Sequence, residues 1–379
     1  MAADAESAAM ATDKRLAHHA AQLWRAGGLR AVTFGAVAKE AASGKSLVSH
    51  HFPSHRHLLL AAGHLVAGAL AEKLEAIAQA LQASDRAARQ DGPAILIERL
   101  LYEDGEQATC LLELCALALS DADFRDMLAP IFAAIARIAA LAEADTRLIQ
   151  IAVLGELLQH APIPRSPLGP QGLRERMRLF TAPGAQHPVL AEGFRSLANA
   201  RVEKRALAAQ DRQDPSPEDR RERIVLAARN LLARGEDPSH RAIAAEAGVS
   251  LSATTYYFKS RTDIVIGIYE RIQADTREGR AQAAFASVSD TREFIAALRA
   301  LLPYYPAHPD ATVAHLNLVL LAARTPPLRD WADRAQKLEI SGLHQLLARF
   351  EPDIGIDLGR ASLSVISGLA LDLLLHPPD

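Results

Sequence analysis

The sequence predicts an all-α protein built as two tandem domains. Alanine and leucine dominate the composition and aromatic residues make up only 5%, a balance that favours helices over strands. A chain of 379 residues exceeds what one hydrophobic core usually holds, so two domains are expected. One helical pattern also occurs twice, about two hundred residues apart.

Each copy of the pattern starts with an amphipathic helix. Helical periodicity begins near Thr12, where one apolar face consists of Leu16, Ala20, Leu23 and Trp24. The second copy repeats this stripe with Ile224, Ala227, Ala228 and Leu231. Glycines that end a helix follow each stripe, at Gly27-Gly28 and at Gly235.

A helix, a tight turn and a short second helix come next in each copy. They occupy residues 33–52 and 239–258, each with an aromatic residue at its exit. Thr33 and Ser239 are suited to cap the first of the two helices. In the second copy Gly248 allows a left-handed turn, and Ser250 can cap the following helix.

Two short helices in this arrangement are typical of a DNA-reading device. The second helix carries small polar residues and aromatic hydroxyls, and such a helix can enter a major groove and meet base edges. Tyr256, Tyr257, Lys259 and Arg261 can donate to phosphates, which positions the unit without reading sequence. Two such devices in one chain suggest a dimer's geometry within a single polypeptide.

At these residues the chain resembles the tetracycline-repressor (TetR/AcrR) family. Residues 239–264 follow the family pattern T-x-x-x-I-A-x-x-A-G-V-S and Y-x-Y-F-x-S-K-x-x-L closely, with Ser239 for threonine, a displaced tyrosine pattern and Arg261 for lysine. Residues 33–58 keep the frame but have Ala42-Ser43-Gly44 at the turn. The resemblance implies helical regions that bind an effector and dimerise, in a repressor that a small molecule releases from DNA.

The resemblance and the local chemistry together predict the DNA-contacting residues. In the first copy these are Thr33, Lys45, Ser46, Ser49, His50, His51, His55 and Arg56. In the second copy they are Ser239, His240, Leu251, Ser252, Thr254, Thr255, Tyr256, Tyr257, Lys259 and Arg261. The first copy is locally basic, with seven Lys/Arg and two Asp/Glu over residues 12–58, whereas residues 218–264 hold eight and seven. The first unit is therefore expected to hold the DNA backbone more than it reads bases.

Composition shifts divide the chain into five segments. They are 12–58 and 216–264 (helix-turn-helix units), 59–185 and 265–379 (helical regulatory domains), and 186–215 (a partly helical linker). Pro162 to Gly172 is expected to be loop, with a helix from Leu173 to Phe180 after it, and Asp211 to Pro217 to separate the halves. The stretch Val189 to Gln210 is compatible with a helix that takes the place of a last helix missing from the second half.

Late in each half lies a strongly apolar helix with a central glycine. These helices span Leu148 to His160 around Gly155 and Ala361 to His376 around Gly368. We expect the two halves to pack through them as an intramolecular pseudo-dimer, so that two reading helices meet successive major grooves of an asymmetric, imperfect palindrome. A homodimer of the whole chain remains an alternative assembly.

Other function classes receive little support from the sequence. No catalytic arrangement stands out, so no enzyme activity and no cofactor are expected. The histidine-rich stretch 50–57 lacks zinc-ligand spacing, so no metal is expected. Effector-lining candidates are Cys110, Glu113, Cys115 and His160 in one half and Tyr304, Tyr305, His315 and Trp331 in the other, although an ordinary core or surface role is favoured for any single one. The alternative class is a helical ligand- or partner-binding protein with a degenerate first unit.

The expected partners are duplex DNA and an unidentified small molecule, and the expected location is the cytoplasm. The chain has two cysteines, too few for a disulfide framework, which favours a reducing compartment. The N-terminus has neither a basic nor an apolar signal region, and no uncharged apolar run reaches eighteen residues. No membrane association is therefore expected.

Overall fold

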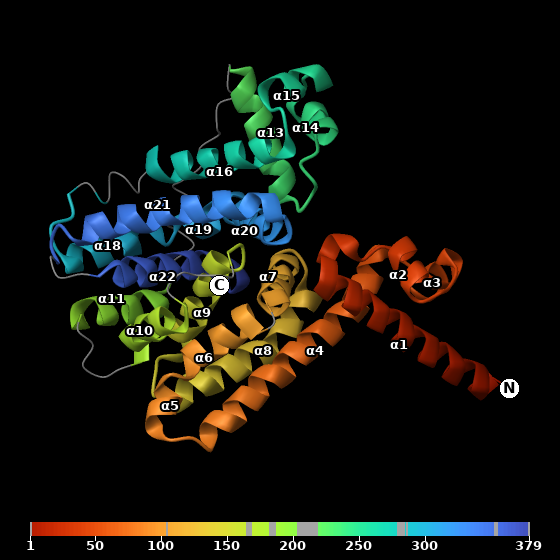
Figure 1. Ribbon diagram of the computed structural model, residues 1–379, viewed down its shortest axis with the longest axis horizontal. Coiled ribbons are helices and arrows are strands. Elements are labelled where there is room, and N and C mark those ends of the chain that lie inside the picture. Colours follow the sequence, from red (N-terminus) through yellow and green to blue (C-terminus); the bar gives the residue numbers. More distant parts are fainter. Residues whose placement is uncertain are drawn as a thin grey trace. The chain divides into compact units, whose positions relative to one another are not determined.

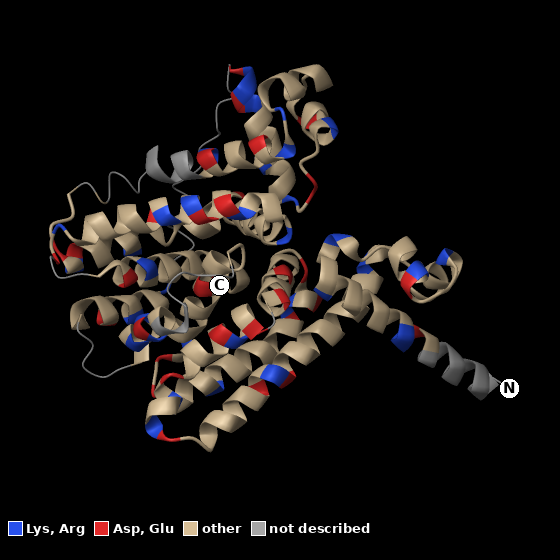
Figure 2. Cartoon of the chain, viewed as in Figure 1, with Lys and Arg blue, Asp and Glu red and all other residues tan. Residues whose placement is uncertain are grey.

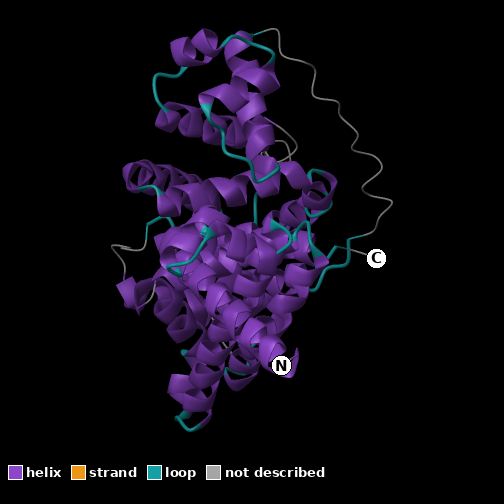
Figure 3. Cartoon of the chain, turned by 90° about the vertical axis from the view of Figure 1, so that its right-hand side faces the viewer, coloured by secondary structure: helices purple, strands orange, loops and turns teal. Residues whose placement is uncertain are grey.

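A computed structural model gives the fold (Figure 1). It describes residues 2–103, 105–163, 169–181, 187–202, 219–278, 285, 287–351 and 355–377. Within these ranges every regular element is a helix, which confirms the predicted all-α class (Figure 3). The chain divides into two compact units, Met1–Ala142 and Glu143–Asp379. Each unit is described by itself below.

The first unit begins with the helix-turn-helix segment and continues as a small helical bundle. Its elements are α1 (Ala2–Gly27), η1 (Leu29–Ala31), α2 (Phe34–Glu40), α3 (Lys45–His51), α4 (His55–Gln82), α5 (Arg86–Gln90), α6 (Gly92–Glu98), η2 (Arg99–Glu103), α7 (Gly105–Ala118) and α8 (Ala122–Leu141). The long helices α4 and α8 lie along one another, with α1 and α7 packed on α4.

Trp24 joins the DNA-binding segment of the first unit to its bundle. The indole ring on α1 is fully buried, and its Nε1 donates to Glu113 Oε2 on α7 at 2.8 Å. Gly63 on α4 leaves room for side chains of α8 beside this ring, because a Cβ there would lie 3.1 Å from both Phe124 Cε1 and Met127 Sδ. A buried carboxylate that accepts from an indole thus fixes the angle at which α1 meets the bundle.

The second unit contains the late helices of the first half together with the whole second half. Its elements are α9 (Thr146–His160), α10 (Gly169–Thr181), α11 (Pro188–Ala198), α13 (Arg220–Ala233), α14 (His240–Ala247), α15 (Leu251–Tyr257), α16 (Arg261–Glu278), α18 (Thr291–Leu301), α19 (Tyr304–Ala307), α20 (Pro309–Arg324), η4 (Pro326–Leu328), α21 (Arg329–Leu347) and α22 (Ile356–Leu375). Helices α9 to α11, expected in the first regulatory domain and the linker, therefore pack with α13 to α22.

Helices α9 and α22 cross with their backbones in close contact. A Cβ on Gly155 would lie 1.8 Å from the carbonyl oxygen of Ser364, and one on Gly368 would lie 1.9 Å from that of Ile151. The contact is reciprocal, since each glycine faces the backbone of the other helix. Only glycine on both helices allows backbone-to-backbone approach at the crossing.

A buried polar cluster lies beside this crossing. Arg176 on α10 donates Nε and Nη2 to the two carboxylate oxygens of Glu156 at 3.0 and 2.9 Å, and both side chains are buried. Ser364 on α22 donates to Glu156 Oε1 at 2.7 Å. Burial alone would raise the pKa of Glu156, but the charge of Arg176 and the hydrogen bond with His160 outweigh it, so this pKa lies below its usual range.

Helix α22 is also the one described helix long and apolar enough by itself to cross a membrane. In the second unit 72% of its most apolar window is buried, and α9, α10 and α21 pack against it. Buried helices of soluble cores have the same length and composition. The packing on three neighbours accounts for the apolar character of α22 without a bilayer.

Several helix boundaries in the structure differ from the predicted ones. Helix α1 begins at Ala2, ten residues before the predicted start at Thr12. Helix α10 begins at Gly169, so the end of the predicted loop Pro162 to Gly172 is helical. The stretch expected to form a helix over Val189 to Gln210 contains α11, which ends at Ala198, and residues 203–218 lie outside the described ranges together with the predicted separator Asp211 to Pro217.

Helix α11 packs on the second half, as the prediction of a substitute last helix requires. A Cβ on Gly193 would lie 2.4 Å from Ile295 Cγ1 on α18, and Ser196 accepts a hydrogen bond from Arg299. Helix α11 therefore covers α18 at close range.

Candidate DNA-binding and effector sites

The predicted helix caps of both helix-turn-helix segments are present. Thr33 Oγ1 accepts from Ala36 N at 3.1 Å, and Ser239 Oγ accepts from Ala242 N at 3.2 Å. Ser250 caps α15 through Ala253 N. Ser260 and Asp263 exchange hydrogen bonds as a capping box at the start of α16, with the Ser260 N–H donating to the carboxylate.

The turn between the two short helices is left-handed in both segments. Gly248 has φ 63°, and Val249 N donates to Ala244 O at 3.0 Å. Ala42 occupies the equivalent position with φ 47°, and Ser43 N donates to Ala38 O at 2.8 Å. The first segment therefore forms the same turn with a residue that disfavours it, because an L side chain is strained at positive φ.

The two short second helices expose equivalent faces. On α3 the exposed residues are Lys45, Ser46, Ser49 and His50, and on α15 they are Leu251, Ser252, Thr255 and Tyr256. Each member of the first set is 206 positions before its counterpart, so the faces are in register. Eight predicted DNA-contacting residues are thus brought together as two outward surfaces.

The middle positions of these faces carry matching chemistry. Ser49 Oγ donates to Lys45 O, and Thr255 Oγ1 donates to Ser252 O, each at 3.1 Å. Because the hydroxyl hydrogen is used within the helix, the oxygen lone pairs remain available as acceptors. Ser46 and Ser252 are identical, and Ser49 and Thr255 both carry a hydroxyl group, so the large chemical differences lie at the first and last positions of the two faces.

Two predicted contacts on the second segment are held within the segment, since Thr254 is buried and His240 is half-buried. Thr254 is fully buried and donates to Leu251 O at 2.8 Å. His240 Nδ1 lies 3.2 Å from Thr254 Oγ1, so this pair holds α14 against α15. Val48, an apolar residue, occupies the equivalent buried position in α3. Sequence reasoning missed this, since threonine also suits a polar surface.

Three predicted contacts at the end of the first segment are engaged inside the first unit. His51 is 11% exposed and forms an ion pair with Asp13 on α1. His55 Nε2 donates to Val32 O at 2.6 Å. Arg56 donates to Asp121 at 2.6 and 2.8 Å and to Asp123 at 2.6 Å, at the start of α8.

Arg261 of the second segment, which is in register with His55, also has a partner within its own unit. Arg261 donates to Asp237, which lies in the loop before α14. His55 and Arg261 are in register, and each therefore ties the start of a long helix to the loop before the first short helix. The hydrogen bonds with Asp121 and Asp123 raise the pKa of Arg56, and Arg56 lowers that of Asp121.

The remaining predicted residues lie at the edges of the exposed faces. Thr33 and Ser239 are exposed as well as capping, and Lys259 is exposed just after α15. Tyr257 is 37% exposed, with its ring edge-on to Tyr256 at 5.2 Å. These residues therefore border the exposed faces of α3 and α15.

Charge is distributed differently on the two segments. Helix α15 contains no charged residue, as Figure 2 shows, whereas α3 begins with Lys45. Near α15, Arg234 donates both Nη atoms to Glu246 at 2.9 Å, which neutralises its charge locally. The second segment has a small net charge because its seven acidic residues nearly balance its eight Lys and Arg residues, and some of these charges form ion pairs.

The side chains of the histidine-rich stretch contact one another and a neighbouring serine. His50 and His51 lie edge to face at 5.3 Å, and the Ser54 hydroxyl lies 2.8 Å from His57 Nδ1. Across the described residues, no three His, Cys, Asp or Glu side chains converge as metal ligands.

The second unit encloses a cavity of about 480 Å³ between α16, α18 to α22 and the end of α9. Its lining is mostly apolar, from Ile272, Leu298, Leu316, Leu343 and Ile366 among others. The volume lies within the range of small-molecule sites. Of the predicted effector-lining residues, Tyr304, Tyr305 and His315 line this cavity.

The polar residues that line the cavity are Tyr304, Tyr305, Thr312, His315, Glu339 and Ser367. Burial lowers the pKa of His315 to about 4 and raises that of Tyr305 to about 12. Both are therefore uncharged near neutral pH. Glu339 lies at the edge and accepts a hydrogen bond from Tyr269.

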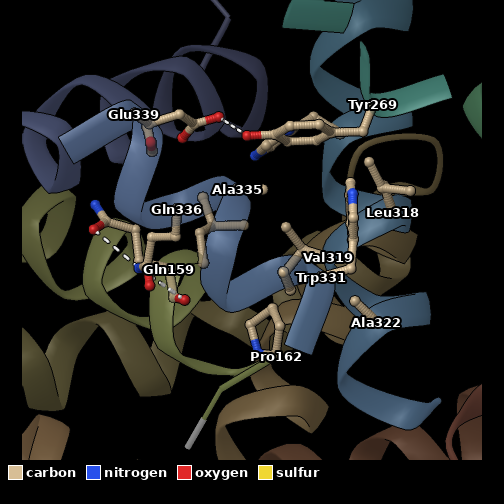
Figure 4. Close-up of a pocket in the computed structure, with 14 residues that line it drawn as sticks. Gln159, Pro162, Tyr269, Leu318, Val319, Ala322, Trp331, Ala335, Gln336 and Glu339 are labelled. Carbon is tan, nitrogen blue, oxygen red and sulfur yellow. Dashed lines mark hydrogen bonds between the residues drawn. The ribbon is translucent and has the colours of Figure 1, made fainter. Parts of the chain in front are cut away.

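A second, smaller cavity of about 60 Å³ adjoins the first and shares His315 and Glu339 with it (Figure 4). Trp331 lines this cavity, with its ring edge-on to Tyr269 at 4.8 Å. Gln336 Nε2 donates to Gln159 O at 3.1 Å on the opposite side. The cavities thus contact α9 of the first half through Leu158 and Gln159.

The predicted candidates of the first half behave as core residues. Cys110, Glu113 and Cys115 are buried in α7, and burial raises the pKa of Cys115 to about 12. His160 is buried beside Glu156, with Nε2 3.1 Å from its carboxylate.

The exposed short helix after a capped helix and a left-handed turn defines a helix-turn-helix DNA-binding protein. Residues 16–62 match the family model described as bacterial regulatory proteins, tetR family. This match covers the first helix-turn-helix segment and supports a DNA-binding transcriptional regulator. No significant match was found among curated proteins. The matched residues are those of the first segment, whose turn departs from the family pattern.

Proposed function

We propose that the chain is a repressor in which two TetR-like halves form an intramolecular pseudo-dimer on DNA. The observation that carries this proposal is the reciprocal crossing of α9 and α22 at Gly155 and Gly368. These helices occupy equivalent late positions in the two halves, and each provides the glycine that lets the other approach. Such an isologous contact is the kind that normally joins two subunits.

In this proposal both short helices read DNA. The faces of α3 and α15 would enter successive major grooves about 34–36 Å apart on one side of the duplex. Because the faces differ in sequence, the operator would be an asymmetric, imperfect palindrome. The proposed organisation keeps helix-turn-helix units at 12–58 and 216–264, regulatory regions at 59–185 and 265–379, and a linker at 186–215.

The cavity of the second unit supports a regulatory role for a small molecule. We propose that it binds a mostly apolar effector and that binding releases the chain from DNA in the cytoplasm. Leu158 on α9 and Ala370 on α22 both line the cavity, so a ligand there touches the two helices of the proposed pseudo-dimer contact. A ligand with differential affinity for the two states shifts their equilibrium.

A gel shift with the DNA upstream of the gene tests the DNA-binding proposal. Wild-type protein should shift this DNA, and its affinity should fall steeply with salt because phosphate contacts release counterions. Lys45→Ala and Tyr256→Ala should each weaken binding about tenfold. Lys337→Ala on α21, outside both segments, is the matched control and should bind as wild type. Unchanged affinity in both test variants contradicts the proposal.

A dye-binding assay tests the cavity. The apolar fluorophore N-phenyl-1-naphthylamine should bind wild-type protein and lose binding in Ala311→Phe, which fills part of the cavity from the first turn of α20. Circular dichroism of this variant checks that it remains folded. Equal dye binding in a folded Ala311→Phe protein excludes the cavity as the binding site.

A further inference from the structure

The exposed faces of α3 and α15, here called the reading faces, differ at three of their four positions, and two of these differ strongly in chemistry. Lys45 on α3 is replaced in register by Leu251 on α15, and His50 by Tyr256. A lysine ammonium donates to the O6 and N7 acceptors of guanine, whereas an apolar side chain contacts the C5 methyl group of thymine. The shared serine and threonine positions do not distinguish the two faces.

The exposure of the α15 residues is unusual for this chain. Across the described residues seven large hydrophobic side chains are exposed, and three of them, Leu251, Tyr256 and Tyr257, lie on this seven-residue helix. Leu251 is 49% exposed and Tyr256 80% exposed. Thr254, which could have offered a polar edge, is buried instead. The outward surface of α15 is therefore apolar and uncharged, apart from hydroxyl groups.

We infer that the two halves of the operator differ in base composition, with a G·C pair under Lys45 of α3 and thymine methyl groups under Leu251 and Tyr256 of α15. This inference rests on the proposed function, since it requires both segments to bind DNA. It goes further by assigning the source of the asymmetry to the first and last positions of the reading faces, 45/251 and 50/256.

A selection from a random duplex library, followed by sequencing, tests this inference with the full-length protein. The wild-type chain should enrich a motif with guanine at one position of one half and thymines at the equivalent part of the other. Lys45→Leu should reduce the guanine preference about tenfold, and Leu251→Lys should introduce a guanine preference at the equivalent position of the second half. The double exchange should move the guanine from one half-site to the other.

Lys39→Leu is the matched control, because Lys39 is an exposed lysine on α2 outside the reading face. It should leave the enriched bases unchanged. The exchanged side chains are exposed, and melting temperatures equal to wild type confirm that the variants are folded. A symmetric wild-type motif, or unchanged base preferences in folded exchange variants, overturns the inference. Failure to enrich any sequence would instead contradict the proposed function.

Discussion

At the residue scale, Ala42 shows how the first segment keeps the family's turn without the family's glycine. Its φ of 47° matches the left-handed conformation of Gly248 at 63°, and in both turns the next N–H donates to the carbonyl five residues before it. The geometry is therefore dictated by the packing of the two short helices. The residue at the turn only changes the free energy of holding it.

Exchanging the turn residues should have opposite effects on stability. Ala42→Gly should raise the free energy of unfolding of the first unit by up to about 1 kcal/mol, since it removes left-handed strain. Gly248→Ala should lower that of the second unit by about 1 kcal/mol, and since no atom lies within 4 Å of a Cβ there, the loss would come from the backbone alone. Urea denaturation followed by circular dichroism measures both; equal signs would contradict this explanation.

Glu156 should make the second unit sensitive to acid. Its pKa is lowered in the folded state relative to the ordinary value of 4.5, so the ionised form contributes stability above that value. As pH falls below about 4.5, the unfolded chain binds a proton that the folded chain does not, and this contribution is progressively lost.

The test compares melting temperature against pH for wild type and Glu156→Gln. The variant should be less stable near neutral pH, because Arg176 loses its buried charged partner, and should show a shallower decline in acid. Glu192→Gln, an exposed surface carboxylate paired with Arg195, should follow the wild-type curve. An unchanged acid slope in Glu156→Gln would refute the assignment.

At the element scale, the sequence predicted where helices begin and end better than it predicted which of their side chains are exposed. Caps, glycine stops and apolar stripes depend on neighbouring residues, so Thr33, Ser239, Gly248 and the capping box of Ser260 could be identified from local spacing. Contacts between distant residues could not. Arg56 binds Asp121 and Asp123, more than sixty residues away, which no local pattern indicates.

The burial of Thr254 illustrates the same limit. A threonine at this position is compatible with either side of a short helix, and only the packing of α14 decides that it pairs with His240. The cavity of the second unit likewise depends on six helices of the second half and on the end of α9. Only three of its polar lining residues could be named as candidates from their side-chain chemistry.

The crossing of α9 and α22 makes a prediction at this scale. Gly155→Ala or Gly368→Ala should lower the free energy of unfolding of the second unit by about 1–3 kcal/mol or more, because the new methyl group must separate two backbones. Gly342→Ala in α21 is the control, since a Cβ there meets no atom within 4 Å, and it should be neutral or stabilising. Thermal unfolding that ranks the three variants alike would contradict close backbone contact.

At the scale of the whole molecule, we propose that one chain supplies both DNA-reading helices of a regulator. Helices α9 and α22, which pack together, come at equivalent places late in the two halves. The exposed faces of α3 and α15 are also in register, at an offset of 206 residues. A chain built in this way can evolve its two faces independently, which an ordinary homodimer cannot do. This independence would account for the different residues at the equivalent positions 45 and 251, and at 50 and 256.

The mass of the protein–operator complex tests this claim most directly. Analytical ultracentrifugation of the selected operator duplex with excess protein should give one chain of 40.8 kDa per duplex. The complex should weaken when either Lys45 or Tyr256 is changed to alanine. Two chains bound per duplex, with a single helix-turn-helix segment of each required for binding, would contradict the account.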